Sequence, residues 1–276
     1  MKIVACGRGR VVQSAAALAE VLRLAGKPAS SLNLLYLGTA SFEDRGAFEA
    51  QTAGFAAAGC SAISQLRLTR PSHTPPDAER RRLVERADVI VVSGGNTLFA
   101  VRRWHELGVD DLLRSAAARG CVMAGGSAGA IVWFGGGHSD SMDPATVLDA
   151  DLDALGAEAL ASWRYIKVNG LGLISGTTLC PHHDTTQSNG LLRSRDFDEM
   201  LLRGDCGDDA VGICVEDQAT LVIEGDSYWT VASGATMVDG AAANGASAAA
   251  KCFVKRVVDG VVISAQLTEG SVREWR

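Results

Sequence analysis

The first half of the chain alternates short apolar runs with amphipathic stretches, and this alternation limits the fold more than any other feature. Runs such as KIVAC (2–6), LNLLYL (32–37) and VIVV (89–92) are each followed by apolar residues at helical spacing. Such βα repeats are typical of a mostly parallel sheet with helices on both faces. We therefore predict a three-layer α/β/α fold, with residues 1–276 forming a single domain.

The second half departs from this pattern after a predicted helix over residues 191–204. Short apolar runs with tight turns follow it, and we expect antiparallel strands toward the C-terminus. Earlier, residues 135–172 are typical of a long loop with a helical segment over 144–163, whereas LGLISGTTLC (171–180) indicates a strand. The uncharged, alanine-rich segment 240–250 favours a loop or a short helix.

Composition and charge disfavour several classes of protein. The chain has 276 residues, 47% of them hydrophobic and 21% charged, with a net charge of −6. These values fit a globular protein and argue against a phosphate-backbone binder. The basic run ERRRLVER (79–86) favours a solvated helix face, because acidic neighbours offset its charge. We therefore expect no nucleic-acid partner.

The N-terminal residues and the cysteines bear on localisation and cofactors. MKIVACGRGR (1–10) lacks the long apolar region of a signal peptide, and no run approaches the roughly 18 apolar residues of a membrane span. The seven cysteines contain no CxxC pair, which favours reduced, buried thiols over a zinc site. We expect a cytoplasmic protein without metal, organic cofactor or membrane partner.

A serine lies between glycines in CVMAGGSAGAIVWF (121–134), where Gly125, Ser127 and Gly129 form Gly-x-Ser-x-Gly. The apolar run before it indicates a buried strand, and the run after it can start a helix. A serine on such a turn is presented for attack, and its neighbours must lack side chains that would collide with adjacent elements. The alternative is a glycine-rich turn that only allows close helix packing.

A serine nucleophile needs a base, and the chain has five histidines. His182 and His183 follow a predicted strand and a proline, where parallel sheets present their functional loops. We predict that one of them is the base. His138 follows three glycines and stays open, whereas His73 and His105 suit surface or packing roles. No histidine lies beyond residue 183, so the serine, acid, histidine order of α/β-hydrolases is not met.

The base in turn needs a carboxylate on its second nitrogen. Glu216 and Asp217 end a predicted strand, where adjacent side chains face opposite ways, so only one of them can point at the histidine. Asp140 follows the serine more closely in the sequence and is the third candidate. The residues alone leave all three open.

Hydrolysis by a serine also needs two donors for the oxyanion. The N–H of Ala128, directly after the serine, is one candidate. Gly95 in SGGNT (93–97) supplies the other, because the glycines after that predicted strand leave backbone N–H groups accessible. Asn96 also suits the N-cap of the helix that follows, and the two roles are compatible.

Together these motifs resemble peptidase family S51, the family of aspartyl dipeptidase (peptidase E) and cyanophycinase. The resemblance rests on six stretches in order: GTAS (38–41), VVSGGNT (91–97), AGGSAGAIVWF (124–134), SDS (139–141), LCPHHD (179–184) and ICVEDQATL (213–221). It implies a variant of the class I glutamine-amidotransferase fold in which serine replaces the usual cysteine nucleophile.

By this resemblance, Ser127 is the nucleophile and His182 is the base in preference to His183. Asp217 matches the position of the acid best, ahead of the two other carboxylates. The implied reaction is hydrolysis of a peptide bond after an N-terminal aspartate, through an acyl-enzyme. The implied partner is a short acidic peptide, and the sequence is compatible with a homodimer.

Recognition of an aspartate side chain requires a cation, and an arginine fork binds a carboxylate in a bidentate manner. Arg193 and Arg195 follow the histidines in the sequence and can supply this cation, or they can form ion pairs on a helix surface instead. The extra material between residues 143 and 171 can cover the site or exclude larger peptides. The predicted substrate contacts are Asn96, Thr97, His183, Arg193 and Arg195.

Other functions compete with this interpretation. Within enzymes, a cyanophycinase-like or amidase activity on another acidic substrate uses the same residues. A binding protein that keeps the fold without turnover predicts the same pocket. A nucleotide-binding role for GRGRVV (7–12) is disfavoured, because Val12 stands where the phosphate loop needs its third glycine.

Overall fold

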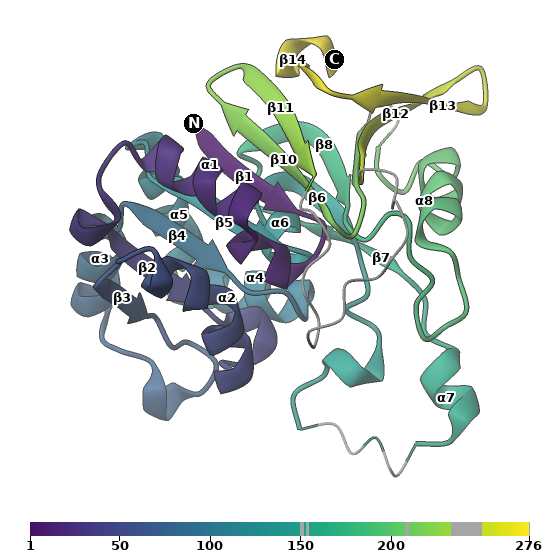
Figure 1. Cartoon of the computed structure of the whole chain (residues 1–276). Helices are drawn as coiled ribbons and strands as arrows, with labels where there is room; N and C mark the ends of the chain where they lie inside the picture. Colours follow the sequence, from purple (N-terminus) through teal and green to yellow (C-terminus); the bar gives the residue numbers. More distant parts are fainter. Residues whose placement is uncertain (150–151, 153–154, 208–209, 233–249, 276) are drawn as a thin grey trace, which may run out of the picture.

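The computed structural model describes residues 1–149, 152, 155–207, 210–232 and 250–275. Over these ranges the chain forms two sheets with helices packed against them, which confirms the predicted α/β class (Figure 1). The segment 240–250, predicted as a loop or short helix, lies outside the described residues apart from its last residue.

The first sheet contains the N-terminal strands and three later ones: β1 (Lys2–Cys6), β2 (Asn33–Leu37), β3 (Ala62–Gln65), β4 (Val89–Val92), β5 (Val122–Gly126), β10 (Ala219–Glu224), β11 (Ser227–Ala232) and β14 (Glu269–Ser271). Their order is β14-β11-β10-β1-β5-β4-β2-β3. Neighbouring strands in the series β1-β5-β4-β2-β3 pair in parallel, as predicted for βα repeats. The three later strands pair antiparallel, so β1 lies between parallel β5 and antiparallel β10.

The second sheet contains the remaining strands: β6 (Phe134–Ser139), β7 (Ile166–Asn169), β8 (Ile174–Cys180), β9 (Val211–Val215), β12 (Cys252–Val258) and β13 (Val261–Leu267). Their order is β13-β12-β9-β8-β6-β7. The central strands β6, β8 and β9 are parallel, and the outer strands pair antiparallel. The parallel strands thus extend to the β3 edge of the first sheet but form the centre of the second, and antiparallel strands complete both sheets.

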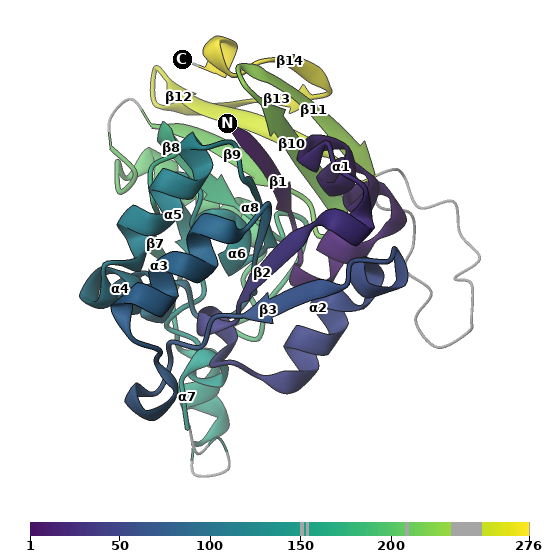
Figure 2. The ribbon, with the colours of Figure 1, turned by 90° about the vertical axis from the view of Figure 1, so that its left-hand side faces the viewer.

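Helices cover both faces of the first sheet: α1 (Ala15–Ala25), α2 (Arg45–Ala57), α3 (Asp77–Arg86), α4 (Thr97–Leu107) and α5 (Val109–Ala118). Alternation along β1 explains the layers, because Ile3 and Ala5 join one core with residues of α4 and α5, whereas Val4 and Cys6 join another with residues of α1 and α2. Figure 2 shows α1 and α2 on one side of the sheet and α3, α4 and α5 on the other.

Local signals place the helix ends. Ser14 accepts a hydrogen bond from the N–H of Ala17 (3.3 Å) and caps the start of α1, and Gly26 caps its end in the left-handed conformation. Gly108, also left-handed, separates α4 from α5. The basic run predicted as a solvated face lies on α3, where arginines pair with acidic residues of the same helix.

The predictions for residues 128–172 are wrong in two places. The helix that starts after Ser127 is only α6 (Ala128–Ile131), and the predicted loop contains β6 and β7 beside α7 (Ala157–Ala161). β6 was not predicted from the sequence because three of its residues are glycines, and glycine has low strand propensity. One of them is needed for packing, because a Cβ on Gly137 would lie 2.5 Å from the Ile131 side chain of α6.

The strands that carry the predicted site end at one edge of the protein. β5 ends before Ser127, and β8 ends before His182. β9 runs parallel to β8, and the turn after it leads into β10, whose start lies beside the end of β1. The carboxyl ends of parallel strands are where α/β proteins place functional residues.

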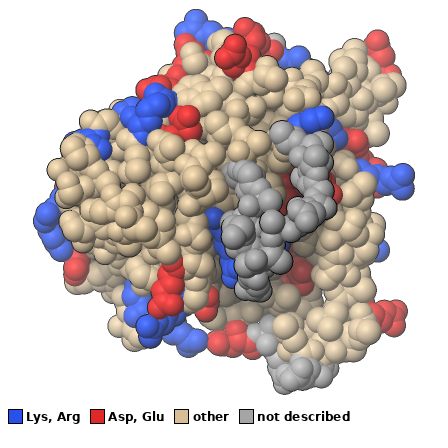
Figure 3. Space-filling view, in the orientation of Figure 1, with Lys and Arg blue, Asp and Glu red and all other residues tan. Residues whose placement is uncertain are grey.

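The seven cysteines are buried and unpaired, as predicted from their spacing. On the face drawn in Figure 3, basic and acidic side chains of the described residues are interspersed. Within the described part of the chain, no helix combines the length and apolar character needed to cross a bilayer.

Candidate active site

Ser127 forms the sharp turn between β5 and α6. Its backbone angles are φ 56° and ψ −123°, and a positive φ costs free energy for a residue with a side chain. Its N–H donates to the carbonyl of Cys6 at the end of β1 (3.2 Å). A strained serine on a strand-to-helix turn is the geometry in which Gly-x-Ser-x-Gly presents a nucleophile.

The glycines around Ser127 are required by close backbone approaches. A Cβ on Gly126 would lie 2.1 Å from the carbonyl oxygen of Arg8, and one on Gly129 would lie 2.1 Å from that of Val92. Both obstacles are main-chain atoms, so a larger residue would displace the turn. The glycines thus serve close packing and hold Ser127 in its strained position.

His182 follows β8 and contacts Asp217, which lies in the turn between β9 and β10. His182 Nδ1 is 2.6 Å from Asp217 Oδ1, and the two side chains are 12% and 11% exposed. His182 also has a positive φ, of 49°. Its Nε2 is then the nitrogen available to exchange a proton with a nucleophile. Among the described residues no hydrogen bond joins Ser127 Oγ to His182, and such bonds are often longer before substrate binds.

The second oxygen of Asp217 has its own partners. Gln218 Nε2 donates to Oδ2 (2.6 Å), and Arg8 Nη1 lies 3.3 Å from the same atom. Burial raises the pKa of the Asp217 carboxyl, but the hydrogen bond and charge of His182 and the charge of Arg8 outweigh burial and hold this pKa below its ordinary value. Asp217 is therefore ionised at neutral pH, the form that orients and stabilises an imidazolium.

The end of β1 lies between the serine turn and the turn that carries Asp217. On one side, the carbonyl of Arg8 packs on Gly126. On the other, a Cβ on Gly7 would lie 1.9 Å from the carbonyl oxygen of Glu216. These contacts bring the predicted nucleophile and the histidine–aspartate pair to the same edge.

Residues 93–97 lie against the serine. A Cβ on Gly94 would be 3.9 Å from Ser127 Oγ, and Gly95 has a φ of 123°, which glycine adopts more readily than other residues. Within the described residues, the N–H groups of Gly95 and Ala128 donate to no protein acceptor. Two free donors beside a serine are what an oxyanion hole requires.

Asn96 and Thr97, both predicted to contact substrate, are engaged within the protein. Asn96 Oδ1 accepts from the N–H of Phe99 (2.9 Å) and so caps α4. Its Nδ2 donates to the carbonyls of Ser141 (3.0 Å) and Thr146 (2.9 Å). Thr97 is fully buried. The Asn96 side chain therefore links the loop of Gly95 to the segment after β6.

Of the three candidate acids, Asp217 is the one that contacts His182. Glu216 faces away from it and accepts the N–H of Lys251 (2.7 Å), and burial raises the pKa of its carboxyl. Asp140 pairs with Arg193 (3.3 Å). Strand alternation predicted that one of the two adjacent acids would face the histidine, and the fold determines which one does.

The predicted arginine contacts differ in accessibility. Arg193 is completely buried, donates to the carbonyl of His138 (2.5 Å) and lies over the ring of Tyr165. It is not available to a substrate, which corrects that expectation. Arg195 is exposed in the first turn of α8 (Arg193–Leu202). The sequence could not distinguish the two arginines, because their burial depends on how α8 packs in the fold.

The other histidines are placed in the interior or on the surface. His183 is buried beside Phe253, and burial lowers the pKa of its imidazole. His138 is fully buried, with Nε2 2.7 Å from Asp196 Oδ1. His105 is 85% exposed. Neither buried ring has the accessible setting of His182.

Two residues that hold the second oxygen of Asp217 were not predicted from the sequence. Arg8 is the second residue after β1, and Gln218 comes directly after the aspartate. The available signal for Arg8 was its position at the carboxyl end of a parallel strand, where functional loops gather. GRGRVV (7–12) was considered only as a phosphate loop, a role that its residues disfavoured, and Arg8 was given no other role.

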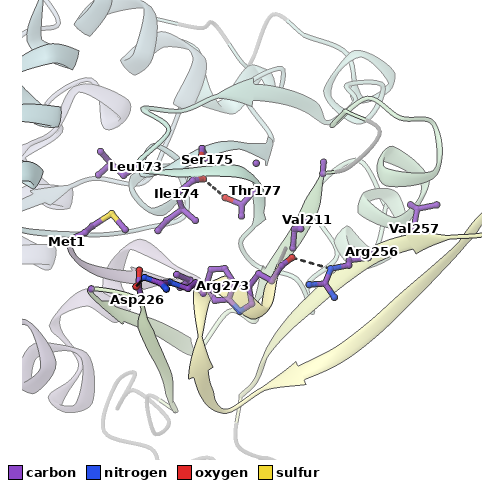
Figure 4. Close-up of a pocket in the computed structure, with 15 residues that line it drawn as sticks. Met1, Leu173, Ile174, Ser175, Thr177, Val211, Asp226, Arg256, Val257 and Arg273 are labelled. Atoms are coloured by element: carbon purple, nitrogen blue, oxygen red, sulfur yellow. Dashed lines mark hydrogen bonds and ion pairs between the residues drawn. The ribbon is translucent and has the colours of Figure 1, made fainter.

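A cavity of about 770 Å³ lies elsewhere in the molecule (Figure 4). It is lined by Met1 and by residues at the starts of β8 and β9, such as Ile174 and Val211, together with Trp275. These strand starts are opposite the ends that carry Ser127, His182 and Asp217, so the cavity is separate from the candidate site. Within the described residues no cluster of acidic, histidine or cysteine side chains is arranged to hold a metal ion.

Comparisons with known proteins identify the family of the chain. A model of Peptidase family S51 matches residues 4–231. The Bacillus subtilis (strain 168) protein named Uncharacterized peptidase YgaJ is 38% identical over 118 residues, which cover 41% of this chain and 42% of that relative. The alignment therefore spans less than half the length of that relative.

Solved structures share the fold at low sequence identity. A structure named for peptidase E from Listeria monocytogenes EGD-e superposes with a TM-score of 0.58 at 17% identity, covering 84% of this chain and 98% of that one. A peptidase from an acI-B1 Actinobacterium superposes with a TM-score of 0.59 at 15% identity, covering 98% and 96%. At these identities the likeness concerns the fold alone.

Proposed function

The chain belongs to peptidase family S51, and from that premise we propose that it is a serine peptidase that cleaves after an N-terminal aspartate. Its substrates are dipeptides or short acidic peptides. Ser127 is the nucleophile, His182 is the base, and Asp217 is the acid that orients the base.

One observation carries this proposal: a strained serine and a histidine–aspartate pair lie at the same edge of the protein. Ser127 has a φ of 56° on the turn into α6, and His182 Nδ1 is 2.6 Å from Asp217 Oδ1. A serine hydroxyl needs a neighbouring base to become nucleophilic, and a base histidine needs a carboxylate on its other nitrogen. This combination supports acyl transfer over simple binding.

In the first half of the reaction, Ser127 Oγ bonds to the substrate carbonyl carbon while His182 Nε2 accepts its proton. The electron pair of the carbonyl moves to oxygen, and the N–H groups of Gly95 and Ala128 stabilise that negative charge. The carbon–nitrogen bond then breaks, the leaving amine takes the proton from His182, and an ester of Ser127 remains.

In the second half, water replaces the amine. His182 accepts a proton from the water as its oxygen bonds to the ester carbon, and the same two N–H groups stabilise the oxyanion. The bond to Ser127 breaks, the serine oxygen recovers the proton from His182, and aspartate leaves. Asp217 remains ionised and stabilises the transient imidazolium in both halves.

Preference for aspartate needs a cation that faces solvent. Arg195 is the exposed arginine of the two predicted from the sequence. The N–H of Arg193 donates to the carbonyl of Thr185 (2.9 Å), which attaches the start of α8 to the loop after His182. This attachment supports Arg195 as the contact for the substrate carboxylate.

The test is hydrolysis of aspartyl-p-nitroanilide by the wild-type protein and by Ser127→Ala. We expect release of nitroaniline by the wild type and a loss of about 10⁴-fold or more in the variant, because the substitution removes the nucleophile. The leucyl and glutamyl anilides measure specificity. A folded Ser127→Ala protein that keeps full activity would exclude Ser127 as nucleophile.

A β-linked aspartyl-arginine dipeptide separates the proposed activity from a cyanophycinase-like one. Preference for the β-linked substrate would redirect the proposal to that class. Binding of acidic peptides without turnover of any substrate would instead support a binding protein on the same fold.

A further inference from the structure

We propose that Arg8 is a positioning residue of the site and acts on the reaction through Asp217. Its guanidinium, together with the amide of Gln218, holds one oxygen of the carboxylate so that the other oxygen stays on His182. The inference rests on the proposed function, because that function makes Asp217 the orienting acid. Arg8 itself touches no reacting atom.

The backbone fixes where the Arg8 side chain begins. Arg8 is the second residue after β1 and has an extended conformation, with φ −125° and ψ 149°. The preceding Gly7 packs so closely on the carbonyl of Glu216 that a Cβ would lie 1.9 Å from its oxygen. On the other side, a Cβ on Gly126 would lie 2.1 Å from the carbonyl oxygen of Arg8. Contacts on both sides leave this segment little freedom.

The two carboxylate oxygens of Asp217 contact different residues. Oδ1 is 2.6 Å from His182 Nδ1, while Oδ2 is 2.6 Å from Gln218 Nε2 and 3.3 Å from Arg8 Nη1. Rotation of a carboxylate about its terminal bond is soft, so contacts on Oδ2 determine where Oδ1 points. Arg8 is 55% exposed, and solvent screening keeps its effect moderate.

The charges around the pair determine the direction of the pH effect. Arg8 faces Asp217 from the β1 side, and Asp184 accepts the backbone N–H of Asp217 (2.7 Å). Glu216 faces the start of β12 through the N–H of Lys251. Removing the Arg8 cation leaves these carboxylates in place, so the His182–Asp217 pair takes up a proton more readily. Activity is then lost at a higher pH on the acid side.

The experiment compares Arg8→Gln with Arg8→Lys and with the matched control Arg10→Gln, which removes an exposed arginine from the same segment. Kinetics with aspartyl-p-nitroanilide across pH are measured for each. We expect Arg8→Gln to lower kcat by about 3- to 10-fold with KM unchanged and to move the acid limb upward. Arg8→Lys restores most of the activity, and Arg10→Gln behaves as the wild type.

A different kinetic pattern would overturn the proposal. A rise in KM for the aspartyl substrate, with kcat and the leucyl substrate unaffected, would place Arg8 on the substrate instead. Unchanged kinetics in Arg8→Gln would leave it without a role in the site. Thermal unfolding of each variant controls for loss of structure.

A second measurement keeps the inference separate from the proposed function. If the wild type cleaves no anilide, the proposed function fails, but the ion pair can still be tested by NMR. The pH midpoint of proton uptake by the pair is followed on the ring nitrogens of His182, assigned with His182→Gln. The proposal requires a higher midpoint in Arg8→Gln and an unchanged one in Arg10→Gln; equal midpoints in all three proteins would refute it.

Discussion

Among the described residues, the two shortest histidine–aspartate pairs are nearly equal in length, and their surroundings differ. His182 and Asp217 are 2.6 Å apart, and His138 and Asp196 are 2.7 Å apart. His182 uses Nδ1 for its carboxylate, whereas His138 uses Nε2. Distance alone does not separate a catalytic pair from a structural one.

Position in the fold makes the difference. His138 lies within β6, fully buried, with its ring stacked on Tyr165 and its Nδ1 4.0 Å from Cys180 Sγ. His182 lies just beyond the end of β8 with a positive φ, at the edge that carries Ser127. A buried ring with both nitrogens facing protein atoms stabilises the core, while a ring at a strand end can exchange protons with a substrate.

The largest test of this comparison replaces each histidine with glutamine. We expect His182→Gln to lower kcat by about 10⁴- to 10⁶-fold with little change in stability, because it removes the base. We expect His138→Gln to lower the free energy of unfolding by about 2–4 kcal/mol and to preserve most of the activity per folded molecule, because it breaks a buried pair. Anilide kinetics and urea unfolding measure the two effects, and equal losses of activity would remove the distinction.

The aspartates sharpen the same contrast. Asp217→Asn should lower kcat by about 10⁴-fold, because an amide no longer fixes the imidazole tautomer or stabilises its charge. Asp196→Asn should leave kcat within a few-fold of the wild type. Activity is compared at pH 7 after each variant is shown to be folded by circular dichroism. A large loss in Asp196→Asn would show that the buried pair also takes part in turnover.

The buried pair should also contribute to acid stability. The hydrogen bond from His138 lowers the pKa of Asp196 against the opposing effect of burial. A lowered folded-state pKa means that this stabilisation is present above the unfolded value of about 3.9 and is lost as the pH falls through the folded value. Urea unfolding at pH 7 and near pH 3 should show a smaller loss of stability in Asp196→Asn than in the wild type.

The smallest effect is expected at Glu216, the neighbour of Asp217 that faces the other way. Glu216→Gln should change kcat by less than about 2-fold, because its carboxylate accepts only a backbone N–H from Lys251 among the described residues. The same anilide assay beside Asp217→Asn provides the comparison. A loss as large as that of Asp217→Asn would mean that the acid had been assigned to the wrong residue.

Much of the fold could be predicted because it depends on local patterns. Apolar runs followed by helical spacing indicated the parallel strands at the start of the chain, and the structure has β1 to β5 there. β6 and β7 were not predicted. One is rich in glycine and the other lacks a clear apolar alternation, so pairing with neighbouring strands determines their structure. Pairing with β8 stabilises β6 despite its three consecutive glycines.

The sequence by itself determined the serine turn and the strand ends that carry the candidate site, because glycine spacing and strand termination are local properties. Tertiary structure alone decided that Asp217 faces His182, that Arg193 is buried on Asp140, and that Arg8 reaches the carboxylate from β1. These outcomes depend on which strands become neighbours and on which side chains they enclose. Local sequence patterns cannot predict these contacts, because they form between residues that are far apart in the chain.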